Sequence, residues 1–394
     1  MSLASASRLT DRGLAPAQAS LARVFYLGAP WRVRLPPGAD VTEALRHTSG
    51  NTGNLLIGSA LQRQLKVQCL VSRRELGAEY VTRNFDRVII GASNFLYENA
   101  DFKVWADFLE RVDLPCTIIG LGAQAPDSTH PVKVPAGTLK LVRLGAERSK
   151  TLGVRGDWTA SVLAGLGIHN VRVIGCPAMF WNCQPELGFK PAVKGRPLAV
   201  ALNGAAHAVE HAADVTAARK IERQLVQLAL QHGYPYILQN ALELARLIEN
   251  PAAYDPLLLS KAMEQYGLSE LAPEAFVRFV QQTMRIYFRV KDWFEAIRQF
   301  DFVVGTRFHG CLIALLAGVP GFIFALDART RELCELLNLP HQPIQQAGGV
   351  NVDALYESVD LERVKRRYRE LYRNYISFLE ENEIEHNLRQ RVDS

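Results

Sequence analysis

The stretch 301-DFVVGTRFHGCLIALLAGVP-320 contains, in order, the kinds of segment from which this chain is built. Its first apolar run, Phe302 to Val304, is short and does not alternate with polar residues, which is typical of a strand buried on both faces of a parallel sheet. Gly305 ends that run. Arg307 and His309 stand at the head of a second apolar run of helical length, which stops at a Gly-Val-Pro sequence. The stretch therefore predicts a strand, a tight polar turn and a buried helix.

The same unit recurs along the chain. Short apolar runs bounded by Gly or Pro occur at residues 88–90, 117–121, 171–174, 198–202, 236–238 and 322–326. Helical patterns lie between them, for example at residues 157–167 and 216–233. Because strands that alternate with helices are typical of parallel sheets covered by helices, the pattern predicts the α/β class.

The length and the distribution of Pro and Gly predict two domains. A chain of 394 residues exceeds what one hydrophobic core usually organises, since domains of about 150 residues are common. Residues 184–197 contain three prolines and two glycines and interrupt the periodic pattern, so we place the boundary there. We expect a flexible tail at 1–22, an N-terminal domain at 23–185, a C-terminal domain at 190–345 with a helical insertion at about 241–299, and an amphipathic helix within 355–390.

The composition excludes several classes of protein. Hydrophobic residues make up 48% and charged residues 22%, which suits an ordinary globular protein. The net charge of +5, from 45 basic and 40 acidic residues, gives no reason to expect a nucleic-acid partner. The six cysteines include no Cys-x-x-Cys pair, which predicts a reducing, cytoplasmic compartment and no metal site. The longest apolar stretch, residues 313–326, is too short to span a bilayer.

The segment 361-LERVKRRYRELYRNYISFLEENEIEH-386 has apolar residues at helical spacing and a basic opposite face. Two interpretations are open. The apolar face can pack on the body of the protein and leave its arginines in water, or the helix can make peripheral contact with an anionic membrane surface.

Two segments present polar groups where a helix is expected to begin. In α/β domains, ligands bind beyond the carboxyl ends of the strands, where helix N-termini offer unpaired N–H groups. Asn51, Gly53 and Asn54 form a polar turn before an apolar helix, with Asn54 as a candidate N-cap and Gly53 as a point of close backbone approach. Arg155 follows a strand, and its planar guanidinium suits a carboxylate or phosphate or, alternatively, an acidic neighbour.

The third such segment is the turn within 301–320. We expect Thr306 to be the N-cap of the following helix, so that Arg307 and His309 lie in its first turn together with Gly310. His309 could then donate to an anion or exchange a proton, or simply be a buried histidine with a hydrogen bond. His207 and His211 have a spacing that suits metal on one helical face, but the sequence shows no third ligand.

Together these segments resemble the polysaccharide pyruvyl transferase family. Its motifs are an Asn-x-Gly-Asp turn, a Val-Arg strand end followed by a helix and a Gly-x-Pro, and an Arg-x-His-Gly before an apolar helix and Gly-Val-Pro. Here they are 51-NTGN-54, 154-VRGDWTASVLAGLGIHNVRVIGCP-177 and 307-RFHGCLIALLAGVP-320. The three motifs occur in the family's order and span roughly residues 50 to 340.

The resemblance implies a fold, a donor and an acceptor. The fold would be two Rossmann-like domains facing a central cleft, as in the GT-B glycosyltransferases, with the acceptor on the N-terminal side and the donor on the C-terminal side. The donor would be phosphoenolpyruvate, with no other cofactor and no metal. The acceptor would be a cell-surface glycan or its lipid-linked oligosaccharide precursor, and the product a pyruvate ketal. Formation of a homo-oligomer is left open.

The resemblance also assigns roles to residues. Arg155 and Arg307 would hold the phosphate and carboxylate of phosphoenolpyruvate, with help from backbone N–H groups between Thr306 and Gly310. His309 would protonate the enol methylene, so that a sugar hydroxyl can attack the neighbouring carbon. Asn51, Gly53 and Asn54 would contact substrate.

Two departures from the family pattern leave alternatives open. Asn54 stands where the family has an acidic residue, and Arg329 or Arg331 would have to replace a lysine that tends to follow Gly-Val-Pro. A nucleotide-sugar glycosyltransferase of the same architecture is one alternative function. A glycan-binding protein without catalysis is another, and Asn54 is the residue that points to it.

Overall fold

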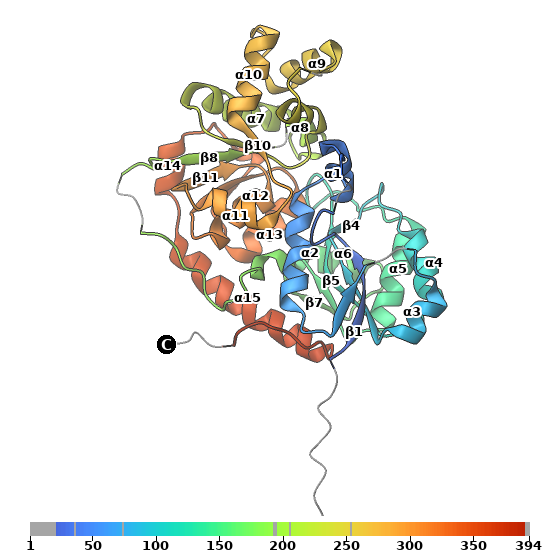
Figure 1. Ribbon diagram of the computed structural model, residues 1–394. Coiled ribbons are helices and arrows are strands. Elements are labelled where there is room, and N and C mark those ends of the chain that lie inside the picture. The colour runs from blue at the N-terminus through green and yellow to red at the C-terminus, as the bar shows by residue number, and fades with distance from the viewer. Residues whose placement is uncertain are drawn as a thin grey trace, which may run out of the picture.

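The computed structural model describes residues 21–34, 37–72, 75–191, 195–204, 206–252 and 254–390, and contains two parallel sheets, each flanked by helices. Figure 1 shows the two sheets in separate halves of the molecule. The α/β class expected from the sequence is confirmed. The flexible tail expected at 1–22 falls, except for its last two residues, outside the described residues.

The first sheet has the strand order β2-β1-β3-β5-β6-β7, with β4 paired to β5, and every pairing is parallel. Its strands are β1 (Arg23–Gly28), β2 (Cys69–Val71), β3 (Arg87–Gly91), β4 (Asn94–Leu96), β5 (Cys116–Ala123), β6 (Leu152–Val154) and β7 (Val171–Val173). Its helices are α1 (Val41–His47), α2 (Gly53–Gln64), α3 (Ala78–Asn84), α4 (Lys103–Arg111), α5 (Ala136–Glu147) and α6 (Asp157–Gly165). All eight residues of β5 are buried, as an unbroken apolar run predicts for a central parallel strand.

The second sheet has the order β10-β9-β8-β11-β12-β13 and is also entirely parallel. Its strands are β8 (Val200–Asn203), β9 (Tyr236–Leu238), β10 (Met284–Ile286), β11 (Phe302–Gly305), β12 (Gly321–Ala325) and β13 (His341–Pro343). Its helices are α7 (Val215–His232), α8 (Leu242–Glu249), α9 (Pro256–Tyr266), α10 (Pro273–Thr283), α11 (Val290–Ile297), α12 (Phe308–Leu316), α13 (Ala328–Leu337) and α14 (Val352–Glu357), and short 3-10 turns are η1 (Pro177–Phe180), η2 (Ala206–His211) and η3 (Ile344–Gln346).

The insertion expected at about 241–299 is helical only in part. Helices α8, α9 and α10 form a group at one end of the second domain, at the top of Figure 1. Residues 284–286, which the sequence placed in a helical segment, instead form strand β10, parallel to β9 at the edge of the sheet. A strand of three residues is too short to produce a detectable two-residue periodicity.

The C-terminal helix α15 (Leu361–Glu381) packs on both domains. In Figure 1 it runs, in red, along the lower side of the molecule from the second sheet toward the first. Arg367 donates to the Leu336 carbonyl in the second domain at 2.8 Å, and Asn374 donates to the Val173 carbonyl in the first at 2.6 Å. The apolar face of α15 is buried, so the structure shows the first of the two interpretations, a helix packed on the protein body.

Candidate functional site

The loops at the carboxyl ends of strands from both sheets enclose a small cavity of about 60 Å³. The residues that line it come from both domains: Asn51, Asn54, Ser93, Asn94 and Arg155 from the first, and Gln239, Arg307, Phe308, His309, Arg329 and Leu333 from the second. Five of the eight site residues that the sequence predicts therefore line the same cavity. The other three, Gly53, Thr306 and Gly310, are not lining residues but adjoin them in the chain.

Arg155 is 2% exposed and held by two hydrogen bonds. Its Nε donates to the Gly120 carbonyl at 3.0 Å and its Nη1 to Oδ1 of Asn94 at 2.7 Å. A side chain at Gly122 would collide with Arg155, because an added Cβ would lie 2.7 Å from its Cδ. The remaining nitrogen, Nη2, is buried without a hydrogen-bond partner among the described residues. A buried donor of this kind is costly unless a ligand accepts from it.

Arg307 is the N-cap of α12 and is positioned by its own backbone. Its N–H donates to Oδ1 of the buried Asn203 at 3.0 Å, which fixes the turn after β11. Burial and the nearby Arg329 lower the pKa of Arg307 to about 10, although Glu222 and other acidic groups act in the opposite direction. The guanidinium therefore stays charged at neutral pH, beside a second cation.

His309 lies against the N-terminus of α2 from the other domain. Its Nε2 is 3.6 Å from Sγ of Cys176, and an added Cβ on Gly53 would lie 2.9 Å from its Nδ1. Only a glycine at position 53 lets the two domains approach this closely. Burial, and then the charges of Arg155, Arg329 and Arg307, hold the pKa of His309 well below its usual value. The imidazole is therefore neutral when no anion is bound beside it.

The turn at 51–54 differs from expectation in one respect. Helix α2 begins at Gly53 with Thr52 as N-cap, so Asn54 is not the cap. Asn51 accepts from the Gly53 N–H at 2.9 Å through its Oδ1, and Nδ2 of Asn54 donates to the Thr48 carbonyl at 3.0 Å. The Thr52 N–H donates to the Gln239 carbonyl across the domain boundary at 2.8 Å, which leaves Asn51 and Asn54 on the cavity wall.

Thr306 and Gly310 have structural contacts that the sequence did not indicate. The Thr306 hydroxyl bonds to the buried Glu222, so it does not cap α12. The Gly310 N–H donates to the Arg307 carbonyl at 3.1 Å and is not free for a ligand. A Cβ at Gly310 would lie 2.7 Å from Cγ of Asn203, so this glycine lets α12 pack on the residue that holds Arg307.

A sequence profile of the family described as polysaccharide pyruvyl transferase matches residues 51–327, which is more than half of the chain. The chain belongs to this family. Membership confirms the resemblance carried by 51–54, 154–177 and 307–320, all of which lie within the match. It indicates a transferase that acts on a polysaccharide. No curated protein matches the chain in sequence.

Several solved structures are similar in their overall chain path. UDP-N-acetylglucosamine 2-epimerase from Rickettsia bellii is 9% identical, over 92% of this chain and 96% of that chain, with a TM-score of 0.44. UDP-GlcNAc 2-epimerase from Methanocaldococcus jannaschii is 11% identical over 90% and 99%, with a TM-score of 0.41. An E. coli structure described as trehalose-6-phosphate bound with UDP-2-fluoro glucose is 10% identical over 92% and 97%, with a TM-score of 0.43.

The structure shows which of the two arginines that could replace the family's lysine lies in the site. Arg329 lines the cavity, is partly exposed, and pairs through Nη2 with Oδ2 of Asp327 at 3.1 Å. Arg331 lies on the outer face of α13, where it pairs with Glu335 at 2.6 Å. Arg329 is therefore a third cation in the site and Arg331 is a surface residue.

Sequence reasoning missed four residues of the site. Ser93 and Asn94 follow β3 at the start of β4, and Gln239 directly follows β9, where the carboxyl-end rule could have found them. Cys176 contacts His309 from the Gly-x-Pro motif, a contact that no local pattern reveals.

The arrangement fits an anion. Three guanidiniums share the cavity, and none of the described residues that line it is a carboxylate. Nε2 of Gln239, like Nη2 of Arg155, is a buried donor without a partner among the described residues. Asp327 offsets part of the positive charge through its pair with Arg329, and the remaining charge and unpaired donors are stabilised by an anionic ligand.

Among the residues that the structure describes, no group of three or more His, Cys, Asp or Glu side chains could hold a metal ion, and the side chain of His207 lies outside them. Within the same part of the chain, none of the helices combines the length and the apolar character needed to cross a bilayer.

Proposed function

We propose that this protein transfers the pyruvyl group of phosphoenolpyruvate to two hydroxyls of a glycan, or of its lipid-linked precursor, and so forms a pyruvate ketal. The observation that carries the proposal is the cavity between the domains, which Arg155, Arg307 and Arg329 line together and which has no carboxylate among its described lining residues. Phosphoenolpyruvate is a small trianion whose phosphate and carboxylate suit planar guanidinium groups. The family match supports transfer of a pyruvyl group.

The charge of the donor also explains how His309 can act as an acid. Without a bound anion, burial and then the charges of the three arginines hold the pKa of His309 well below its usual value. A bound trianion offsets their charge, so the pKa of His309 rises and the imidazole takes up a proton. The substrate thereby creates the imidazolium that its own activation requires.

The reaction then balances without a metal or a further cofactor. The His309 imidazolium gives its proton to C3 of phosphoenolpyruvate, and a sugar hydroxyl oxygen forms a bond to C2 and returns its proton to His309. The C2–O bond to phosphate breaks, and a second hydroxyl oxygen bonds to C2. The departing phosphate carries away the second hydroxyl proton. Arg155, Arg307 and Arg329 stabilise the charge that moves onto the phosphate.

The family's acidic residue is replaced by Asn54, which has no basic oxygen to offer. In the proposed sequence His309 and the leaving phosphate accept the two hydroxyl protons, so a carboxylate at position 54 is not needed. Because phosphoenolpyruvate is made in the cytoplasm, the protein would work there, next to the membrane when its acceptor is lipid-linked.

The test is release of inorganic phosphate from phosphoenolpyruvate in the presence of a panel of galactosides, mannosides and hexosaminides. We expect release that depends on one of these acceptors and falls by about 100-fold or more in His309→Ala, the loss typical of a removed general acid. Full activity in His309→Ala would contradict the mechanism. Tight binding of a UDP- or GDP-sugar with no binding of phosphoenolpyruvate would instead identify a glycosyltransferase.

A further inference from the structure

The turn after β7 brings the thiol of Cys176 next to the candidate site. Cys176 is fully buried, and its Sγ lies 3.6 Å from Nε2 of His309. The N–H groups of Ile174 and Gly175 donate to the carbonyl of Val154, the last residue of β6, at 2.9 and 3.2 Å. Because two backbone hydrogen bonds tie this turn to the first sheet, the thiol has a fixed place beside the imidazole.

The two ring nitrogens of His309 lie in different surroundings. Nε2 faces the thiol, whereas Nδ1 makes no hydrogen bond within the part of the chain that the structure describes. Nδ1 is also not one of the fully buried polar atoms that lack a partner there, so it is open to the cavity that His309 lines. A Cβ added to Gly53 would lie 2.9 Å from Nδ1, 2.6 Å from Oε1 of Gln239 and 3.1 Å from Oδ1 of Asn51, and both amides line the cavity. Nδ1 is therefore the ring nitrogen on the ligand's side.

The thiol of Cys176 suits this place because it can both donate and accept a hydrogen bond. Burial raises the pKa of Cys176, although the charge of Arg155 and a hydrogen bond from the Ala178 N–H act in the opposite direction, so the thiol stays neutral. Because the sulfur already accepts from that N–H beside a cation, its own S–H is left to donate to Nε2 of a neutral His309. A carboxylate in this place would attract a proton to the ring even without a ligand.

We propose that Cys176 is a positioning residue that holds Nε2 of His309, so that Nδ1 is the nitrogen that exchanges a proton with the substrate. The inference rests on the proposed function for the identity of that substrate. Nδ1 of the imidazolium gives its proton to C3 of phosphoenolpyruvate, while Nε2–H stays in its hydrogen bond to Sγ. The proton of the first sugar hydroxyl then passes to Nδ1. One nitrogen therefore serves as acid and as base, and the other remains bound to the thiol throughout.

The contact between Cys176 and His309 is tested without any substrate, by long-range ¹H–¹⁵N NMR of the full chain with labelled histidine rings. The signals of His309 are those that disappear in His309→Gln. At neutral pH we expect a neutral ring with its hydrogen on Nδ1, because Nε2 accepts from the thiol. Cys176→Ala should show the hydrogen shared between the two nitrogens, and Cys176→Ser should restore the preference for Nδ1, because a hydroxyl also donates and accepts.

Kinetics test what the contact does for the reaction. Cys176→Ala should lower kcat for acceptor-dependent phosphate release by about tenfold and leave the KM for phosphoenolpyruvate unchanged, because the imidazole loses one hydrogen bond while the arginines still hold the donor. Cys176→Ser should recover most of that loss. Nδ-methylhistidine in place of His309 blocks Nδ1 and leaves Nε2 free, so it should lower phosphate release by about 100-fold or more, as His309→Ala does.

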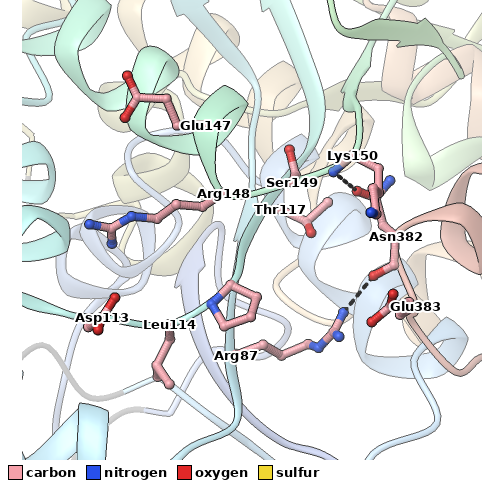
Figure 2. Close-up of a pocket in the computed structure, with 11 residues that line it drawn as sticks. Arg87, Asp113, Leu114, Thr117, Glu147, Arg148, Ser149, Lys150, Asn382 and Glu383 are labelled. Atoms are coloured by element: carbon pink, nitrogen blue, oxygen red, sulfur yellow. Dashed lines mark hydrogen bonds between the residues drawn. The ribbon is translucent and has the colours of Figure 1, made fainter.

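The matched control is Cys116→Ala. Cys116 is also fully buried, but it lies at the amino end of β5, between two residues that line the pocket of about 460 Å³ shown in Figure 2. That pocket is at the opposite edge of the sheet from the carboxyl ends that form the site. Cys116→Ala should therefore leave the tautomer of His309 and the kinetics unchanged. Melting temperatures show whether each variant is folded.

Three outcomes would overturn the assignment: the hydrogen of the neutral ring lies on Nε2, Cys176→Ala leaves the ring signals of His309 unchanged, or the protein with Nδ-methylhistidine keeps its activity. Failure of the proposed function looks different. In that case the unaltered protein releases no phosphate from phosphoenolpyruvate, whereas the tautomer of His309 and its dependence on Cys176 are still measured by NMR.

Discussion

His309 shows how the charge of single residues defines this site. Its imidazole lies among three arginines, and burial together with those charges holds the pKa of His309 well below its ordinary value. Such a histidine resists protonation until a counter-charge arrives. Its other neighbour, the thiol of Cys176, is buried, and burial also raises the pKa of that thiol, so it stays neutral beside Nε2.

Binding of phosphoenolpyruvate should therefore take up about one proton near neutral pH, because the trianion raises the pKa of His309. Calorimetric titration in buffers with different ionisation enthalpies measures this uptake directly. His309→Gln should still bind phosphoenolpyruvate but without the proton uptake. Equal proton uptake in the unaltered protein and in His309→Gln would place the titrating group elsewhere.

The residues of the site differ in how far the sequence could predict them. Arg155, Arg307 and His309 follow strands or begin a helix, so local patterns and the carboxyl-end rule placed each of them at the carboxyl edge of its own sheet. The choice between Arg329 and Arg331 needed the orientation of α13. Thr306 was expected to cap α12, but Glu222 on α7 binds its hydroxyl, and a partner 84 positions away leaves no local signal.

At the scale of elements, one carboxylate joins two helices of different domains. Glu332 on α13 accepts from the N–H of Thr159 at 2.7 Å and from its hydroxyl at 2.9 Å, at the first turn of α6. Gly156 leaves room for it, because an added Cβ would lie 2.2 Å from Cγ of Glu332. Burial raises the pKa of Glu332 from an ordinary 4.5 to about 7, although the bonds to Thr159 and the charge of Arg155 lower it.

This pKa predicts a pH dependence of stability. Between about pH 4.5 and 7 the folded protein keeps a proton on Glu332 that the unfolded chain releases, so the free energy of unfolding falls as the pH rises through this range. Glu332→Gln keeps a neutral hydrogen-bonding group and should remove that fall. Relative to the unaltered protein it should be more stable by up to roughly 3 kcal/mol at pH 8 and equally stable near pH 5.

Urea unfolding at several pH values measures the effect. Glu335→Gln is the matched control, because Glu335 lies on the same helix but is exposed and paired with Arg331. If Glu332→Gln lowered stability at pH 8, the carboxylate would be stabilising the contact in its ionised form, contrary to this account.

Element boundaries were predictable where strands are buried and helices are long. Each predicted apolar run overlaps a strand, and α7 was placed within a residue at each end. Strand β10 was not found, because three residues at a sheet edge gain their pairing from β9, which is distant in sequence. Helix α2 starts at Gly53, one residue before Asn54, which the sequence had suggested as its N-cap. The N-cap is Thr52, which makes no side-chain capping bond and whose N–H donates to the Gln239 carbonyl of the other domain.

At the scale of the whole molecule, α15 fixes how the two domains face each other. Its buried face continues the core that α12 and α13 form in the second domain and reaches α2 in the first. Tyr375 donates to Oε1 of the fully buried Gln64 at 2.8 Å, and Nε2 of Gln64 donates to the Pro177 carbonyl at 2.8 Å. The amphipathic pattern of this helix was visible in the sequence, but its path across the domains was not.

Tyr375→Phe should therefore destabilise the protein by about 1–3 kcal/mol, because it leaves Oε1 of Gln64 buried without a donor. The midpoint of urea unfolding measures the loss. Tyr266→Phe is the matched control, since the Tyr266 hydroxyl is buried and has no hydrogen-bond partner among the described residues. Removing that hydroxyl should be neutral or stabilising. Equal losses in the two variants would argue against the specific role of the Tyr375 bond.

The central claim is that the cavity between the domains binds phosphoenolpyruvate. Calorimetric titration of the full chain with phosphoenolpyruvate tests it most directly, with Arg155→Met and Arg331→Met compared side by side. We predict one site per chain, a loss of about 10- to 100-fold in affinity for Arg155→Met from the removal of charge-assisted hydrogen bonds, and no change for Arg331→Met. Absence of binding, or equal affinity in the two variants, would contradict the account.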